Sequence, residues 1–254
     1  MNINSLSGST VSFRSSETNA MEKGSAISTN NQSVIVFNET ESQKQSIVST
    51  LARQLADVNV RAETRDASLS HDELAQKAKT LLSQITGPGY QNNRAKYDAE
   101  VPDTDDPALL ERAKQATAFV NGSGSNPFKG LTGDQLALII YDDSGTFTAN
   151  ERRAASYESD AQEYAWRRSA VMKSEIEWNQ GDYKQTEFFK MVLAHYEEQP
   201  LIEQVQYSEE HTSRLQYLIE MDFNFMTGER GNHGNSFINL RNNLLSSGPY
   251  GDGK

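Results

Sequence analysis

Residues 141–151, YDDSGTFTANE, place oxygen-bearing side chains at alternate positions and end on a glutamate. Ca²⁺ takes about six to eight oxygen ligands, and a carboxylate that binds through both oxygens often completes the set. Gly145 supplies the backbone freedom that a sharp turn inside such a loop needs. Calcium is therefore the cofactor that this segment favours. The predicted metal ligands are Asp142, Ser144, Thr146, Thr148 and Glu151.

Over residues 140–151 the segment resembles a degenerate EF-hand loop, with Gly145 at the sixth place and Glu151 at the twelfth. The first place, where such loops carry an anchoring aspartate, is Ile140, which has no ligand atom. A second interpretation explains most of the same residues. The aspartates, serine and glycine are common turn formers, and Thr148 with Glu151 forms a capping box for a following helix. The missing ligand favours the capped turn, and the ion site is the alternative.

No other pattern in the chain assigns a catalytic or cofactor-binding residue. The sequence has no cysteine, which excludes thiolate zinc sites, cysteine nucleophiles and disulfides. His195 and Glu198 have the reverse order of a di-iron motif and occur once. A further interpretation is an enzyme in which Asp142, Asp143 and Glu151 perform acid–base or metal-assisted chemistry. The spacing of these three residues along the sequence does not determine how their carboxylates are arranged in space.

Composition argues against several classes of partner. The formal net charge is -11, whereas nucleic-acid binding requires clustered Lys and Arg. No run approaches the roughly 18 apolar residues of a membrane-spanning helix. The first twenty residues lack the pattern of a Sec-type signal peptide. Their Ser, Thr and Asn content resembles the leaders of bacterial type III secreted proteins, and a disordered tail would look the same. We therefore expect a protein that is cytoplasmic or is exported without a Sec-type signal.

Apolar residues recur at helical spacing, which predicts an all-α fold, mainly a bundle. Helix starts are predicted at Ser70, Asp106, Thr132 and Thr148, each of which can cap a helix. The low-complexity stretch GSGSNP, at residues 122–127, predicts a domain boundary. The expected organisation is a polar leader, an N-terminal helical region, a C-terminal helical domain and a flexible tail. Their ranges are 1–41, 42–122, 126–228 and 229–254.

Residues 149–179 contain neither proline nor glycine and predict one helix of roughly 45 Å at about 1.5 Å per residue. This helix is amphipathic, and an amphipathic helix of this length can serve as a binding surface for another protein. Its apolar face consists of Ala154, Tyr157, Ala161, Tyr164, Ala165, Val171, Met172 and Ile176.

The run NPFKGLTGDQLALIIYDDSGTFTANERRAA, at residues 126–155, resembles a segment of hypothetical proteins found in pseudomonads. The likeness extends over about residues 126–228. It implies a bacterial source and a C-terminal helical domain, and it brings no activity or catalytic residue with it. Together these features favour a non-enzymatic bacterial protein that binds a protein partner, either in the cytoplasm or after export. The calcium-responsive module and the enzyme are the two alternatives.

Overall fold

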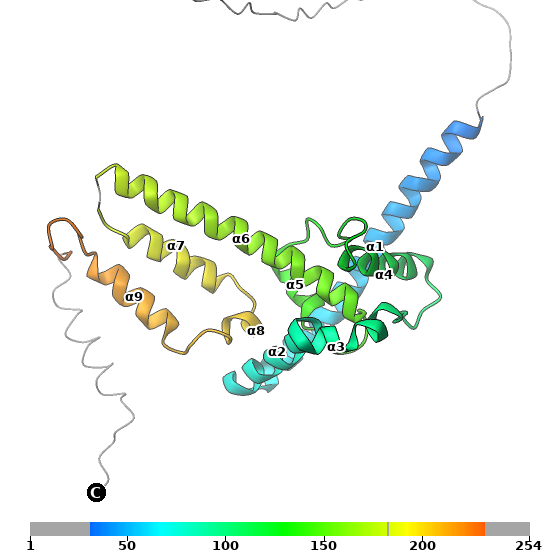
Figure 1. The fold of residues 1–254 in the computed structure, drawn as a ribbon, viewed down its shortest axis with the longest axis horizontal. Coiled ribbons are helices and arrows are strands. Elements are labelled where there is room, and N and C mark those ends of the chain that lie inside the picture. The colour runs from blue at the N-terminus through cyan, green and yellow to red at the C-terminus, as the bar shows by residue number, and fades with distance from the viewer. Residues whose placement is uncertain (1–30, 182, 232–254) are drawn as a thin grey trace, which may run out of the picture. The chain divides into compact units, whose positions relative to one another are not determined.

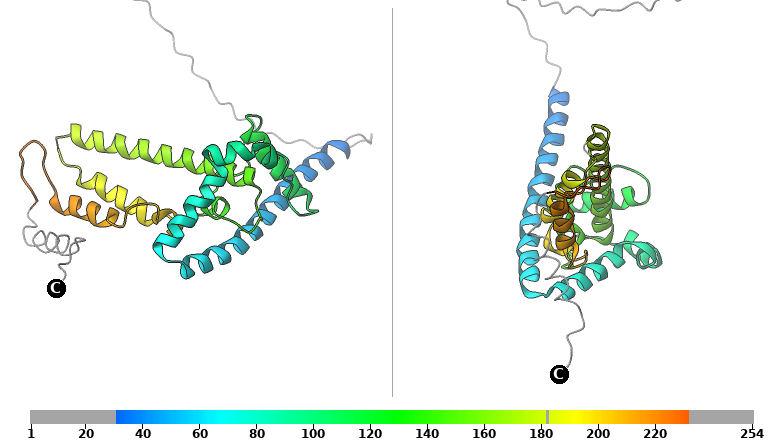
Figure 2. Two further views of the ribbon diagram at one scale, coloured as in Figure 1. Left: turned by 60° about the horizontal axis from the view of Figure 1, so that its bottom comes forward. Right: turned by 90° about the vertical axis from the view of Figure 1, so that its left-hand side faces the viewer.

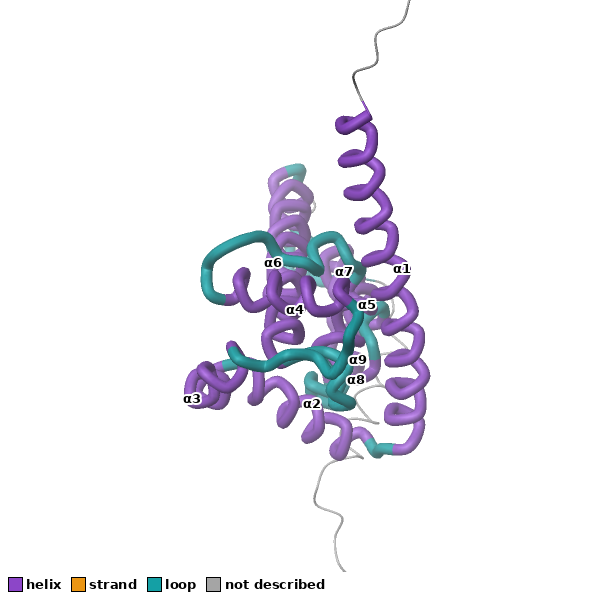
Figure 3. Tube along the Cα trace, turned by 90° about the vertical axis from the view of Figure 1, so that its right-hand side faces the viewer, coloured by secondary structure: helices purple, strands orange, loops and turns teal. Residues whose placement is uncertain are grey.

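A computed structural model describes residues 31–181 and 183–231 of the chain, with side chains described from residue 50 onward. Within these ranges the chain forms helices and no strand, which confirms the all-α prediction (Figures 1 and 3). The predicted leader up to residue 30 and the tail from residue 232 lie outside the described residues. The helices are α1 (Asn31–Ser68), α2 (His71–Ile85), α3 (Gly87–Asp98), α4 (Pro107–Val120), α5 (Gly133–Ile140), α6 (Ala149–Asn179), α7 (Thr186–Glu197), α8 (Leu201–Gln204) and α9 (His211–Met221).

The chain divides into two compact units, residues 1–41 and 42–254. In the first unit, residues 31–41 form the first turns of α1. No proline or glycine interrupts them, so each further residue adds a helical hydrogen bond to turns that already exist. The sections below concern the second unit. No helix in the described residues is both long and apolar enough to cross a membrane.

Residues 122–127, the predicted domain boundary, lie inside the second unit. The Asn126 amide donates to the backbone oxygen of Ala154, at 2.7 Å, and the ring of Phe128 is fully buried. The glycines and serines make this segment a loop, as expected. Asn126 holds this loop against α6, and Phe128 directly after it belongs to the same core as residues of α1, α2, α5 and α6.

The predicted helix starts at Ser70, Asp106, Thr132 and Thr148 are confirmed. Each side chain accepts a hydrogen bond from a backbone N–H in the first turn, which stabilises a helix by about 1 kcal/mol. After α2 the chain turns into α3 within two residues, and Gly89 makes this possible. A Cβ on Gly89 would lie 2.0 Å from the backbone oxygen of Ser83, so only glycine fits this corner.

The core lies where α6 begins. The first turns of α6 pack against α2, α3, α4 and α5, and the later turns pack against α7, which packs in turn against α9. The left view of Figure 2 shows α6, α7 and α9 side by side. The fully buried large apolar side chains are Tyr90, Phe128, Leu74, Ile85, Leu136, Ile139 and Ile202.

Candidate functional site

The predicted ion-binding loop connects α5 to α6, so helices flank it on both sides as the motif requires. Gly145 has φ +84°, a conformation that favours glycine, at the sixth place of the loop. The buried carboxylate of Asp142 accepts a hydrogen bond from Ser144 Oγ, at 2.8 Å to Oδ2, and forms an ion pair with Arg61 Nη2 at 3.3 Å. Arg61 also donates to Thr146 Oγ1 at 2.9 Å. Asp142 and Thr146 therefore both contact one arginine of α1, and Ser144 contacts both of these predicted ligands.

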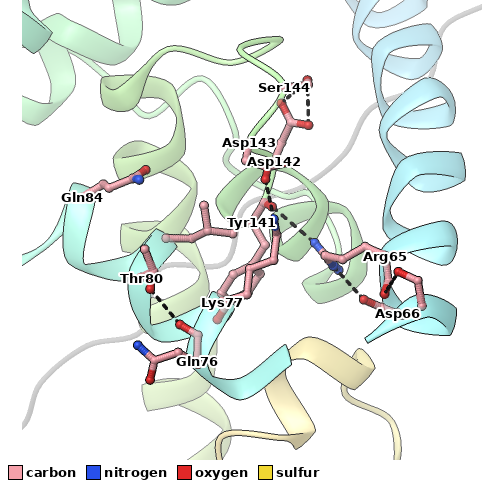
Figure 4. A network of polar contacts seen from close by, with 12 residues as sticks. Arg65, Asp66, Gln76, Lys77, Thr80, Gln84, Tyr141, Asp142, Asp143 and Ser144 are labelled. Carbon is pink, nitrogen blue, oxygen red and sulfur yellow. Dashed lines mark hydrogen bonds and ion pairs between the residues drawn. The ribbon is translucent and has the colours of Figure 1, made fainter. Parts of the chain in front are cut away.

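The same loop also contacts α1 and α2 through neighbouring groups (Figure 4). Lys77 Nζ lies 2.6 Å from Asp143 Oδ2, and this hydrogen bond lowers the pKa of the Asp143 carboxyl below its ordinary value. Arg65 Nη1 donates to the backbone oxygen of Tyr141 at 3.3 Å. Basic side chains of both α1 and α2 therefore contact the acidic turn that connects α5 to α6.

Glu151, the predicted bidentate ligand, is fully buried and both of its oxygens accept hydrogen bonds. Oε1 lies 2.7 Å from Arg112 Nε. Oε2 accepts from the backbone N–H and the hydroxyl of Thr148, at 2.8 and 3.0 Å, which completes the predicted capping box. Calcium binding through Glu151 would require these bonds to break.

Asp142, Asp143 and Glu151 do not converge on one point. Among the described residues, one group of three ligand atoms from histidine, aspartate or glutamate lies within 4.8 Å of one another, and it is His71, Asp72 and Glu209 on the surface. Exposed groups of this kind are common without an ion. The calcium site and the carboxylate enzyme site stay predictions, and the contacts of the loop are those of a capped turn.

Arg112 is the partner that the sequence reasoning missed. Its side chain is 4% exposed and lies over the rings of Phe147 and Phe128, with its guanidinium carbon 5.0 and 5.7 Å from their centroids. It donates to Gln54 Oε1 at 2.8 Å as well as to Glu151. A glutamate at the third position of a helix that starts inside the core needs such a cation, and this requirement is the signal that could have found Arg112.

A polar cavity of about 330 Å³ lies between α6 and the segment that leads into α8, and Tyr141, Asp160, Glu163 and Glu203 contribute to its lining. Burial raises the pKa of Glu203 to about 7, and the charges of Glu163, Asp134 and Asp160 add to the rise. Burial opposes ionisation of Glu163 too, but hydrogen bonds from His195 and Arg167 outweigh it and lower its pKa. The cavity thus contains two carboxyl groups whose pKa values are shifted in opposite directions.

The predicted apolar face of α6 is mostly exposed. Its exposed large side chains are Tyr157 (40%), Tyr164 (68%), Val171 (49%), Met172 (52%) and Ile176 (54%). The side of the helix that meets α7 is more polar: Glu163 Oε2 lies 2.7 Å from His195 Nε2, and the ring of His195 stacks on Trp166 at 3.6 Å. We call the five exposed residues Tyr157, Tyr164, Val171, Met172 and Ile176 the α6 face.

Comparison of the chain with protein-family models, with curated proteins and with solved structures finds no match. The resemblance to proteins of pseudomonads therefore stays a prediction, and any functional argument has to come from the residues themselves.

Proposed function

We propose that this chain acts by binding a protein partner through the α6 face. The observation that supports the proposal is the exposure of five large apolar side chains on a helix whose first turns are buried in the core. Tyr157, Tyr164 and Val171 are seven residues apart, close to two helical turns, so they follow one side of the helix. Met172 and Ile176 extend the stripe at its C-terminal end.

Single exposed apolar residues are normal on protein surfaces, whereas several large apolar side chains gathered on one side of a helix mark an interaction site. The stripe covers twenty residues from 157 to 176, which is about 30 Å of helix. Its members are two large rings, a thioether and two branched chains, the kinds of side chain that dominate the buried centres of interfaces. A helix with anchors at this spacing fits recognition of one helix by another helix or by a groove.

Site-specific photo-crosslinking tests the proposal. Benzoylphenylalanine in place of Tyr164 or Met172 should yield a discrete adduct when the full chain is irradiated in its source cells. The matched control carries the same group in place of Lys173, which is also exposed on α6 but lies on another side of the helix. Val171→Asp, added to each crosslinking variant, should remove the adduct without changing helix content by circular dichroism. Equal adducts at all three positions, or none at any, would contradict the proposal.

A further inference from the structure

We infer that the partner of the α6 face is a second copy of this chain, with the two α6 helices packed antiparallel about a two-fold axis between Val171 and Met172. The inference rests on the proposed function, because it names the occupant of the same face. Such an interface uses one surface twice, so the surface must be complementary to itself. Val171 and Met172 at the centre of the α6 face have this property, and so do the charges of Arg168 and Glu175 beside them.

The charges define the register. Arg168 and Glu175 lie seven residues apart in the stripe, and both are exposed. Within the described part of the chain, neither side chain forms a hydrogen bond or an ion pair. They are equidistant from the point between residues 171 and 172. A two-fold axis at that point therefore brings Arg168 of each copy level with Glu175 of the other, which makes two ion pairs per dimer.

Other registers lose this match. An axis at Arg168 would place the two arginines against each other, and an axis at Glu175 would do the same with the two glutamates. Like charges in an interface oppose association strongly. Only an axis midway between the two residues joins opposite charges while Val171 and Met172 face each other at the centre.

The apolar residues are compatible with this arrangement. Val171 and Met172 fill the space at the two-fold axis. Tyr164 of each copy lies level with Asn179 at the end of α6 in the other copy. The overlap covers residues 164–179, which is about 24 Å of helix. An interface of one helix per copy is small, so we expect a dissociation constant in the micromolar range. Each copy carries a formal charge of -11, and this general repulsion makes the specific opposite-charge pairs important for pairing.

Charge reversal on the full chain tests the register by sedimentation velocity, from about 1 to 200 μM protein in about 0.15 M salt, where long-range repulsion is screened. The wild type should show a concentration-dependent dimer. Arg168→Glu and Glu175→Arg should each weaken self-association at least about tenfold, because each replaces two unlike pairs by two like pairs. An equimolar mixture of these two variants should form a heterodimer, and the double variant should dimerise again.

Both residues are exposed, and their side chains have no partner among the residues that the structure describes, so the thermal midpoints of all variants should stay close to that of the wild type. A wild type that is monomeric throughout the range overturns the inference. A dimer that persists in both charge-reversal variants but is lost in Met172→Asp also overturns the inference, because the α6 face would then pair in another register. That outcome would leave the proposed function in place.

The crosslinking adduct separates the two proposals. Self-pairing predicts an adduct close to twice the chain mass of 28.3 kDa that contains peptides of this chain alone, from two copies. An adduct with a different protein, or a link inside one copy to residues 1–30, overturns self-pairing. Loss of every adduct contradicts the proposed function as well.

Discussion

The two ends of α6 show opposite relations between residue type and burial. At the N-terminal end, Asn150, Glu151 and Arg152 are buried. At the C-terminal end, Tyr164 and Met172 are exposed. Hydrophobicity alone would predict the reverse. The difference shows that the partners available around each turn of the helix decide which side chains the fold can bury.

Asn150, Glu151 and Arg152 at the buried end each form several hydrogen bonds. Asn150 accepts from the Tyr90 hydroxyl at 2.7 Å and donates to Asp98 and Thr117 at 3.0 and 3.1 Å. Arg152 donates to the backbone oxygens of Ile140 and Leu81 and to Gln84, at 2.9 to 3.1 Å. Burial lowers the pKa of its guanidinium. A buried polar group that is fully hydrogen-bonded costs little, whereas one that loses a partner costs a great deal.

The largest effect should follow from removing the buried cation. Arg112→Ala leaves the Glu151 carboxylate without its charged partner and opens space between two aromatic rings. We expect a loss of about 3 to 5 kcal/mol in the free energy of unfolding, measured by urea denaturation. The matched control is Lys77→Ala, which breaks the more exposed pair with Asp143 and should cost under about 1 kcal/mol. Equal losses would contradict the contrast between buried and exposed pairs.

A smaller effect, and one that depends on pH, should come from Glu203. Its pKa is raised from an ordinary value of 4.5 to about 7 in the folded chain. The folded state therefore holds the proton more tightly than the unfolded state does. The ionised group lowers stability progressively as pH rises from 4.5 towards 7, and this cost persists above pH 7. Glu203→Gln removes the cost, so it should stabilise the protein at pH 8 by on the order of 2 kcal/mol.

The pH dependence of unfolding checks this expectation. The gain from Glu203→Gln should shrink as pH falls and be close to zero at pH 4, where the wild-type carboxyl is protonated in both states. Glu151→Gln is the comparison, because that carboxylate is already paired with Arg112. It should destabilise the chain at pH 8, since the buried cation loses its partner. A gain from both substitutions would contradict the distinction between the buried carboxylate of Glu151, which is paired with Arg112, and the half-buried carboxyl of Glu203.

The smallest effect on stability should come from the α6 face. Met172→Ser and Ile176→Ser change side chains that are more than half exposed, so each should alter the free energy of unfolding by less than about 0.5 kcal/mol. The same substitutions should weaken self-association in sedimentation velocity. Ala170→Ser, at a buried position of the same helix, is the control that should affect folding and not association. A strongly destabilised Met172→Ser variant would show that the face is part of the core.

The sequence predicts well those features that depend on neighbouring residues. The capping boxes at Ser70, Thr132 and Thr148, and both ends of α6, follow from groups within a few positions of each other. The all-α class follows from apolar spacing.

Features that depend on distant parts of the chain could not be predicted in this way. Arg112 and Glu151 are 39 positions apart, and nothing local links them. Periodicity identified the apolar side of α6 correctly, but it cannot say whether another element of the fold covers that side. The glycines and serines of residues 122–127 indicated a loop, and only the burial of Phe128 shows that the loop joins one core and does not separate two.

The acidic turn at residues 141–144 has a consequence for the order in which the chain can fold during synthesis. It contacts Arg61 across 81 positions, and Arg152 contacts Leu81 across 71. The inner faces of α1 and α2 therefore lack their partners until the ribosome has produced α5 and the start of α6. Non-local contacts of this kind are slow to form and leave apolar surface open in the meantime. A chain that ends at residue 130 should accordingly unfold without a cooperative transition, and a sharp transition in such a chain would refute this order.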